Sequence, residues 1–279
     1  MRLYQKTSIW SLLNPLEMGR DLLKQRRLLW KFTVRNIEMQ HKGSFLGGAW
    51  TLLQPVFLFA VYAFVFLAVF DSRFGVIEAE TRIDYAIGLF LGLLLVQVVQ
   101  EALAASPHLI LGHPNFVKKV VFPVEILPAA LVGAAAFRCL VGLMLVFAAV
   151  MVWGTPLTWS ALWIVPLFLC LIFVSLGCAW TFAAIGVFVR DVAPVVQLLS
   201  VLLMFASAVF YSFDSIPANF AFLRYNPLLV IVEQSRAVLL WHLPPDPAAL
   251  LYTGVSSIGS CLAGYAIFSG LREAFADVL

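Results

Sequence analysis

The sequence predicts an all-α integral membrane protein with six transmembrane helices, and three observations support this fold class. Of the 279 residues, 62% are hydrophobic and only 12% are charged, whereas soluble domains carry about 25% charged residues. Several apolar runs reach the roughly 20 residues that a helix needs to cross a hydrocarbon core about 30 Å thick. Lysine and arginine are concentrated on one side of these runs, as the positive-inside rule requires.

Residues 1–46 are predicted to form a cytoplasmic segment with an amphipathic helix that lies at the membrane surface, from Asp21 to Lys42. Lys24, Arg27, Lys31 and Arg35 recur at helical spacing and form one basic stripe. Two interpretations stay open. The helix either anchors the chain to anionic lipid headgroups or offers a docking surface to a cytoplasmic partner.

Residues 47–279 are predicted to form the six-span transmembrane domain. A stretch without charges, Cys139–Val189, is too long for one span, and the turn at residues 153–156 divides it. The predicted spans are Gly47–Phe70, Asp84–Ser106, Ile126–Trp153, Ala161–Phe188, Pro194–Phe213 and Ala248–Gly270.

Both termini are predicted to be cytoplasmic, in agreement with an even number of spans. The cytoplasmic side then carries Arg2, Lys6, Arg20, Lys24, Arg26, Arg27, Lys31, Arg35, Lys42, Lys118, Lys119, Arg190 and Arg272. The opposite side carries only Arg73, Arg82, Arg224 and Arg236. Residues 1–15 contain no apolar stretch followed by a cleavage site, so no signal peptide is predicted.

The segment from about residue 214 to 246 is predicted to lie outside and to contain two short helices, because its apolar stretches are too short to cross. Pro227 suits the first turn of a helix, and Glu233 and Arg236 can pair on one face. Backbone at membrane depth must satisfy its own hydrogen bonds, so re-entrant helices are plausible. A folded loop lying on the membrane surface is the alternative.

Arg138 is the one basic residue deep inside a predicted span, where a charge costs at least about 2.5–3.5 kcal/mol. It must therefore face protein or water. Glu101 is the nearest candidate partner in the sequence, although it is predicted to lie closer to the cytoplasmic end. Pairing with another group and a position lining a pore both stay open for Arg138.

The sequence offers little for catalysis or for metal binding. No phosphate-binding loop of the G-x-x-x-x-G-K-[ST] type occurs. The four cysteines lie in apolar runs without paired spacing, so neither a metal site nor a disulfide framework is predicted. The histidines fall in loops or at span ends. No cofactor and no nucleic-acid partner is expected for this chain.

Four ordered sequence blocks between Arg20 and Leu279 resemble the ABC-2 type permeases that export polysaccharides such as O-antigen, capsule and teichoic acid. These blocks are Arg35–Ile37 with Lys42–Gly47, Trp50 and Pro55; Phe116–Pro128; Phe188–Asp191; and Tyr225–Pro227 with Glu233 and Arg236. The chain departs from the family at Gln40–His41, where an Arg-Tyr pair is usual, and at Ser207–Ala208, where Ser-Pro is usual.

The resemblance implies an ATP-driven exporter subunit in the plasma (inner) membrane that moves a lipid-linked polysaccharide outward. Its expected partners are two copies of an ABC ATPase, which would carry ATP and Mg, a second copy of this chain, and membrane lipids. Contact with the ATPase is expected from Lys24, Arg27, Lys31, Arg35, Lys118, Lys119, Phe122, Pro123 and Glu125. From the prolines around it, the segment from Lys118 to Pro128 is predicted to form a stiff helical turn or two between bends.

Channel or gate positions are expected at Trp50, Tyr62, Arg138, Phe210, Tyr211, Tyr225, Asn226, Pro227, Glu233 and Arg236. Among these, Trp50, Tyr62, Phe210 and Tyr211 offer rings on which sugars can stack, although most aromatic residues in spans face lipid or other helices. Two alternative functions stay open. One is an ABC-2 exporter of a small amphipathic compound, and the other is a membrane-embedded transferase acting on a lipid-linked sugar.

Overall fold

The computed structural model describes residues 15–66, 73–76, 80–118, 122–153 and 158–278, and within these ranges the chain is helical without a strand. Five segments are helical, long and apolar enough to cross a membrane: Gly47–Phe64, Arg82–Leu109, Ile126–Trp153, Trp159–Phe188 and Pro247–Val278. The predicted all-α membrane fold is therefore confirmed, with five candidate spans among the described residues.

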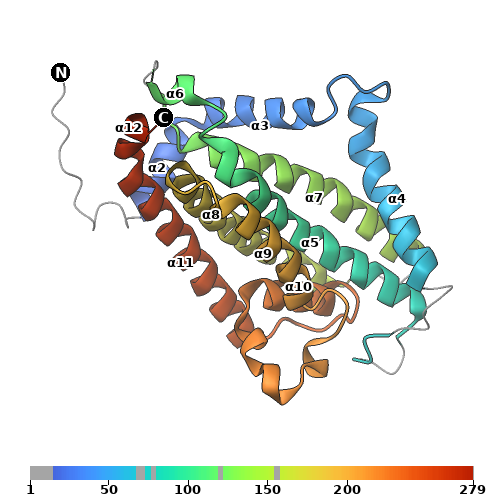
Figure 1. Ribbon diagram of the computed structural model, residues 1–279. Helices are drawn as coiled ribbons and strands as arrows, with labels where there is room; N and C mark the ends of the chain where they lie inside the picture. Colours follow the sequence, from blue (N-terminus) through green and yellow to red (C-terminus); the bar gives the residue numbers. More distant parts are fainter. Residues whose placement is uncertain (1–14, 67–72, 77–79, 119–121, 154–157, 279) are drawn as a thin grey trace.

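Figure 1 shows the helices as a slanted bundle, with α3 lying across one end. The α-helices are α2 (Pro15–Lys24), α3 (Arg26–Gln40), α4 (Trp50–Phe64), α5 (Arg82–Leu109), α6 (Pro114–Lys118), α7 (Ile126–Trp153), α8 (Ile164–Phe188), α9 (Val192–Ala206), α10 (Pro227–Leu239), α11 (Pro247–Leu271) and α12 (Phe275–Val278). Short 3₁₀ helices are η1 (Gly47–Ala49), η3 (Trp159–Trp163), η4 (Phe213–Ser215), η5 (Ala218–Tyr225) and η6 (Arg272–Ala274).

Helix α5 forms the centre of the bundle, packed against α7, α8 and α9. Its side chains are mostly apolar and are buried along most of its length, as expected for a helix that other helices surround. Thr81 and Asp84 form a capping box that starts the helix, in which each side chain bonds the other residue's backbone N–H. The core is therefore organised around one early segment of the chain.

Helices α8 and α11 are in close backbone contact where two glycines meet. A Cβ atom at Gly264 would overlap the carbonyl oxygen of Gly177, and one at Gly177 would overlap that of Ser260. Small residues let membrane helices approach until their backbones touch. The contact between α8 and α11 therefore depends on the missing side chains.

Replacing Gly264 with valine is expected to lower the stability of the protein by about 1–3 kcal/mol, the usual cost of overpacking. The measurement is the thermal unfolding midpoint of the detergent-solubilised chain. Gly259→Val is the matched control on the same helix, because a Cβ there would meet nothing within 4 Å. Equal midpoints for the two variants would contradict the assigned packing.

The predicted surface helix from Asp21 to Lys42 is divided in two, so one continuous basic stripe was the wrong expectation. Helix α2 ends at Lys24 and α3 begins at Arg26, with Gln25 between them at φ −102° and ψ 14°. Arg27, Lys31 and Arg35 remain together on the exposed side of α3. Lys24 belongs to the other helix.

The fifth predicted span ends earlier than the apolar pattern indicated. Helix α9 has 15 residues and stops at Ala206, which makes it about 22 Å long at about 1.5 Å per residue. Ala208 then adopts a left-handed conformation with φ 53°, which ends the helix without the usual proline. Residues 67–72 lie outside the described part, as does the predicted end of the first span at Phe70.

Between α9 and α11 the chain forms three further helical elements, η4, η5 and α10, where two short helices were predicted. Helix α10 is not a loop on the surface, because ten of its residues are buried and it packs against α8, α5 and α11. Its position within the membrane stays a prediction.

The segment from Lys118 to Pro128, predicted to form a helical turn or two, contains a turn at residues 123–127 in its described part. The N–H of Ile126 donates to Pro123 O and that of Leu127 to Val124 O, each at 3.1 Å. The short helix α6 ends at Lys118, where this segment begins, and α7 starts at Ile126. Pro128 therefore belongs to the first turn of a long helix, where its missing N–H costs nothing. Lys119 lies outside the described residues.

Candidate functional site

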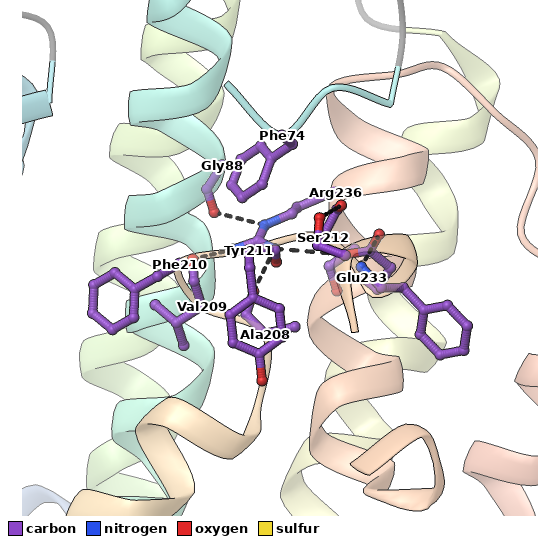
Figure 2. Close-up of polar contacts among 12 residues, drawn as sticks. Phe74, Gly88, Ala208, Val209, Phe210, Tyr211, Ser212, Glu233 and Arg236 are labelled. Atoms are coloured by element: carbon purple, nitrogen blue, oxygen red, sulfur yellow. Dashed lines mark hydrogen bonds and ion pairs between the residues drawn. The ribbon is translucent and has the colours of Figure 1, made fainter. Parts of the chain in front are cut away.

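Arg236 on α10 is fully buried and joins three parts of the chain (Figure 2). Its Nε donates to the carbonyl oxygen of Gly88 on α5 at 3.0 Å. Nη1 donates to Ala208 at 2.6 Å and to Tyr211 at 3.3 Å, and Nη2 donates to Val209 at 2.6 Å. The guanidinium thus donates to four carbonyl groups. Those of Ala208, Val209 and Tyr211 follow the end of α9 and need a partner outside the helix, whereas Gly88 lies within α5.

The charge of Arg236 is balanced by an acid and by an aromatic ring. Glu233 Oε2 lies 3.5 Å from Nη1, which confirms the expected pair. The Phe74 ring lies 4.1 Å from the guanidinium carbon, and the buried carboxylate of Glu80 holds the Phe74 backbone N–H at 3.0 Å. Burial raises the pKa of Glu233, while Arg236 and the backbone N–H of Phe213 act in the opposite direction. Burial also lowers the pKa of Arg236, to about 10, so it stays charged at neutral pH.

Two glycines one turn apart on α5 make room for this arginine. A Cβ atom at Gly92 would lie 2.9 Å from Arg236 Nη2, and one at Gly88 would lie 2.9 Å from both Leu240 and Phe74. The sequence analysis did not predict this space beside Gly88 and Gly92. The four-residue spacing of Gly88 and Gly92, which places both on one helix face, was the available signal.

Asn226 ties the end of α9 to the start of α10. Its side chain accepts from the backbone N–H of Leu228, as an N-cap residue does, and donates to Ala206 O at 3.0 Å and Ser207 Oγ at 3.2 Å. Pro227 takes the first position of α10, as predicted. Tyr225 beside it is exposed, and its carbonyl accepts a hydrogen bond from the Tyr252 hydroxyl on α11.

Arg138 on α7 pairs with Glu101 on α5 through two contacts, one of them from Nε to Oε1 at 3.4 Å. Glu101 lies about 12 Å before the C-terminal end of α5 and Arg138 about 18 Å after the start of α7, at about 1.5 Å per residue. Two long side chains span that difference. These contacts confirm Glu101 as the partner of Arg138. The pair supplies the counter-charge that a charge inside the bundle needs.

This ion pair borders a cavity of about 40 Å³ between α4, α5 and α7. That volume holds one to a few waters. Its polar lining comprises Gln40, Thr51, Gln54, Gln97, Glu101 and Arg138. Pairing and exposure to a polar cavity therefore coexist at Arg138.

Helices α3, α6 and α12 lie together at one end of the bundle (Figure 1). Arg27, Lys31 and Arg35 on α3 and Lys118 at the end of α6 are exposed there. Thr33 is the buried residue of α3 and faces Gly133 on α7, where a Cβ would lie 2.9 Å from Thr33 Oγ1. Helix α3 is thus seated directly on a long helix, with its basic residues turned outward.

An aromatic cluster joins α3 to the segment around α6. The Phe32 ring lies 5.7 Å from Phe116 and 5.3 Å from Phe122, and these two rings stack at 4.6 Å. His113 stacks on Phe116 at 5.7 Å, and the Arg35 guanidinium lies 5.6 Å from the Phe32 ring. Such ring contacts are worth about 0.5–1.5 kcal/mol each. Two elements distant in sequence are thereby held as one unit.

Glu125, expected at a partner surface, instead contacts residues of its own chain. It is buried, its carboxylate lies 3.7 Å from Arg272, and its carbonyl accepts from the Trp180 indole at 3.0 Å. Pro123 beside it is half-buried. Glu125 therefore links the start of α7 to α8 and to the chain after α11.

The aromatic residues expected along a channel are divided between the two ends of the bundle. Phe210 and Tyr211 belong to the segment that Arg236 binds, and Tyr211 donates to Phe205 O at 2.7 Å. Tyr62 lies 6.4 Å from Phe66 and packs against the main core. Trp50 lies at the opposite end of α4 and is partly exposed.

These features define a class of protein: a multi-pass helical membrane protein with a charged pair inside the bundle and a helix seated across one end. The chain belongs to the ABC-2 type transporter family, whose sequence profile matches residues 27–240. The chain thus has the fold of a transport protein.

Curated relatives match the chain over nearly its whole length. An O-antigen export system permease protein RfbA from Myxococcus xanthus is 26% identical over 265 residues, covering 94% of this chain and 99% of that protein. A protein of the same name from Klebsiella pneumoniae is 25% identical over 257 residues, covering 90% and 95%. The relatives are named as permeases, which favours transport over the transferase alternative.

Proposed function

We propose that this chain is the membrane subunit of an ATP-driven exporter that moves a lipid-linked polysaccharide outward across the plasma membrane. Family membership and the coverage of O-antigen export permeases support this proposal. The chain makes or breaks no bond in its cargo. Nucleotide hydrolysis takes place on a separate ATPase.

The aromatic cluster of Phe32, Phe116 and Phe122 is the observation that supports a mechanical link between the ATPase and the helix bundle. A force applied to α3 or to α6 reaches the other element through these rings. The Thr33–Gly133 contact passes it on to α7. The exposed Arg27, Lys31 and Lys118 supply charges to which an acidic ATPase surface binds.

A second copy of the chain completes the path for the cargo. Helix α4 has no buried residue, and α9 exposes large apolar side chains such as Leu198 and Phe205. The path runs between two such copies, beside α4 and α9. At its outer end, the Arg236 network fixes the segment that carries Phe210 and Tyr211.

Charge reversal tests this proposal in the source cells. Cells that lack the chain are expected to lose their surface polysaccharide and to accumulate the lipid-linked glycan inside. The triple variant Arg27→Glu, Lys31→Glu and Lys118→Glu should restore export about tenfold less well than the unmodified chain, because like charges that face each other across an interface repel. Surface glycan is measured by gel electrophoresis of whole-cell extracts.

Arg190→Glu is the matched control, since this exposed residue lies at the end of α8, outside the proposed docking surface. It should export normally. Unchanged surface glycan after deletion of the chain would refute the proposal that its cargo is a polysaccharide. Full export by the triple variant would refute the proposal that these three residues bind the ATPase.

A further inference from the structure

A second cavity, of about 510 Å³, lies between α10, α11 and the segment that precedes α10. It is at the end of the bundle opposite α3 and α6 (Figure 1). Ligand sites are usually clefts of about 300–1,000 Å³. The volume therefore suits a small organic group and exceeds what a few waters need.

The lining combines aromatic rings with carboxylates and an amide. The rings come from Phe213, Tyr225, Trp241 and Tyr252, and the polar groups from Asp214, Glu233, Gln234 and Asp246. Amphipathic rings offer flat apolar faces beside polar edges. A ligand must therefore present apolar C–H faces together with hydrogen-bonding groups.

Two buried atoms at this cavity lack hydrogen bonds among the described residues. They are the indole nitrogen Nε1 of Trp241 and the carboxylate oxygen Oε2 of Glu233, the second of which has only its ion pair with Arg236 at 3.5 Å. Trp241 is only 7% exposed. An unsatisfied buried donor costs about 1–3 kcal/mol, so the indole calls for a ligand that accepts a hydrogen bond, and Glu233 Oε2 can accept one from the same ligand. A hydroxyl group both accepts and donates.

The charges at the cavity exclude an anionic ligand. Three carboxylates line it, against one basic residue, Arg224. Its guanidinium lies 4.9 Å from the Phe213 ring and donates to Ile216 O at 3.4 Å. A phosphate would meet net repulsion here. A neutral polyol with C–H faces, which describes a sugar ring, fits both the charge and the rings.

We propose that this cavity is a carbohydrate-binding site that takes one or two neutral sugar units, with Trp241 Nε1 donating and Glu233 Oε2 accepting. The proposal rests on the proposed function for the source of the sugar, which is the glycan as it emerges. It is independent of the ATPase, because binding needs only this chain. The site lies apart from the docking surface on α3 and α6.

The test uses the full chain in nanodiscs of phosphatidylethanolamine and phosphatidylglycerol, purified without any detergent that has a sugar headgroup. Glucose, galactose, mannose, rhamnose and N-acetylglucosamine are offered in saturation-transfer NMR, and the best binder is titrated. Trp241→Phe keeps a ring but removes the donor, and should weaken binding about two- to tenfold. Ala249→Phe fills the cavity and should abolish binding.

Two matched controls separate the site from the rest of the surface. Trp159→Phe removes a largely exposed indole from η3, and Val255→Phe adds a ring on the exposed face of α11. Both should bind as the unmodified chain does. Each variant is first compared with that chain by gel filtration.

The unmodified chain provides a readout that does not depend on variant folding. A diazirine derivative of the bound sugar should label peptides that contain Tyr225, Trp241 or Tyr252. The proposal is overturned if no sugar of the panel binds, if Trp241→Phe and Ala249→Phe both bind normally, or if labelling occurs only elsewhere. Normal binding in a chain that supports no glycan export would refute the proposed function and leave this site standing.

Discussion

Arg236→Met is expected to lower stability by about 3–5 kcal/mol, the usual cost of removing one partner of a buried ion pair. The variant leaves Glu233 buried without its counter-charge. It also removes the donor to the carbonyl groups of Ala208 and Val209, which follow the end of α9. The measurement is the unfolding midpoint of the solubilised protein, together with its yield from membranes.

Two further variants show whether this loss comes from the network. Arg224→Met removes a nearby arginine that is exposed and makes one long hydrogen bond, so it should change the midpoint little. The double variant Glu233→Gln with Arg236→Met should be less destabilised than the sum of its parts, because the two side chains interact directly. A normal unfolding midpoint for Arg236→Met would show that the contacts of Arg236 do not stabilise the fold.

Arg138→Met is the second large expected effect, with a cost of about 2.5–3.5 kcal/mol for the charge left inside the span. Glu101 then lacks its ion-pair partner next to the small cavity. Glu101→Gln with Arg138→Met removes both charges and should recover most of the lost stability. The unfolding midpoint of the three proteins provides the measurement.

Gln54→Met serves as control, because Gln54 lines the same cavity without a charge. It should unfold close to the unmodified chain. If the double variant is no more stable than Arg138→Met alone, then the unpaired carboxylate is not the cause of the loss.

The long spans could be predicted well because charges and turn residues bracket them. The third span was predicted at Ile126–Trp153, and α7 has these bounds, because Glu125 precedes it and a Gly-Thr-Pro turn follows. The second and sixth predicted spans differ from α5 and α11 by a few residues at their ends. In these segments, local composition and tertiary structure agree.

The end of α9 could not be predicted, because the apolar pattern continues beyond it. The helix stops at Ala206 owing to contacts from distant residues: Asn226 binds Ala206 O and Arg236 binds Ala208 O. No residue near Ser207 in the sequence predicts these hydrogen bonds. For the same reason the pairing of Glu233 with Arg236 was predictable at three residues, whereas the bond to Gly88 was not.

The break at Gln25 escaped prediction for a different reason. The periodic spacing of Lys24, Arg27 and Lys31 fits one continuous helix, and no glycine or proline interrupts it. Packing decides the geometry instead, since Phe32 and Thr33 commit α3 to the aromatic cluster and to α7. Among the predicted docking residues, Arg27, Lys31 and Lys118 are exposed and accessible to a partner. Glu125 is buried and therefore inaccessible.

The Arg236 network also sets an order of events during biosynthesis. The acceptor on Gly88 is translated 148 residues before the arginine, and those on Ala208 and Val209 precede it by 28 and 27 residues. In a nascent chain the carbonyl groups of Ala208 and Val209 therefore lack this donor until α10 has been synthesised. A chain that ends before Arg236 cannot make these hydrogen bonds, so the segment after α9 becomes fixed only late in synthesis.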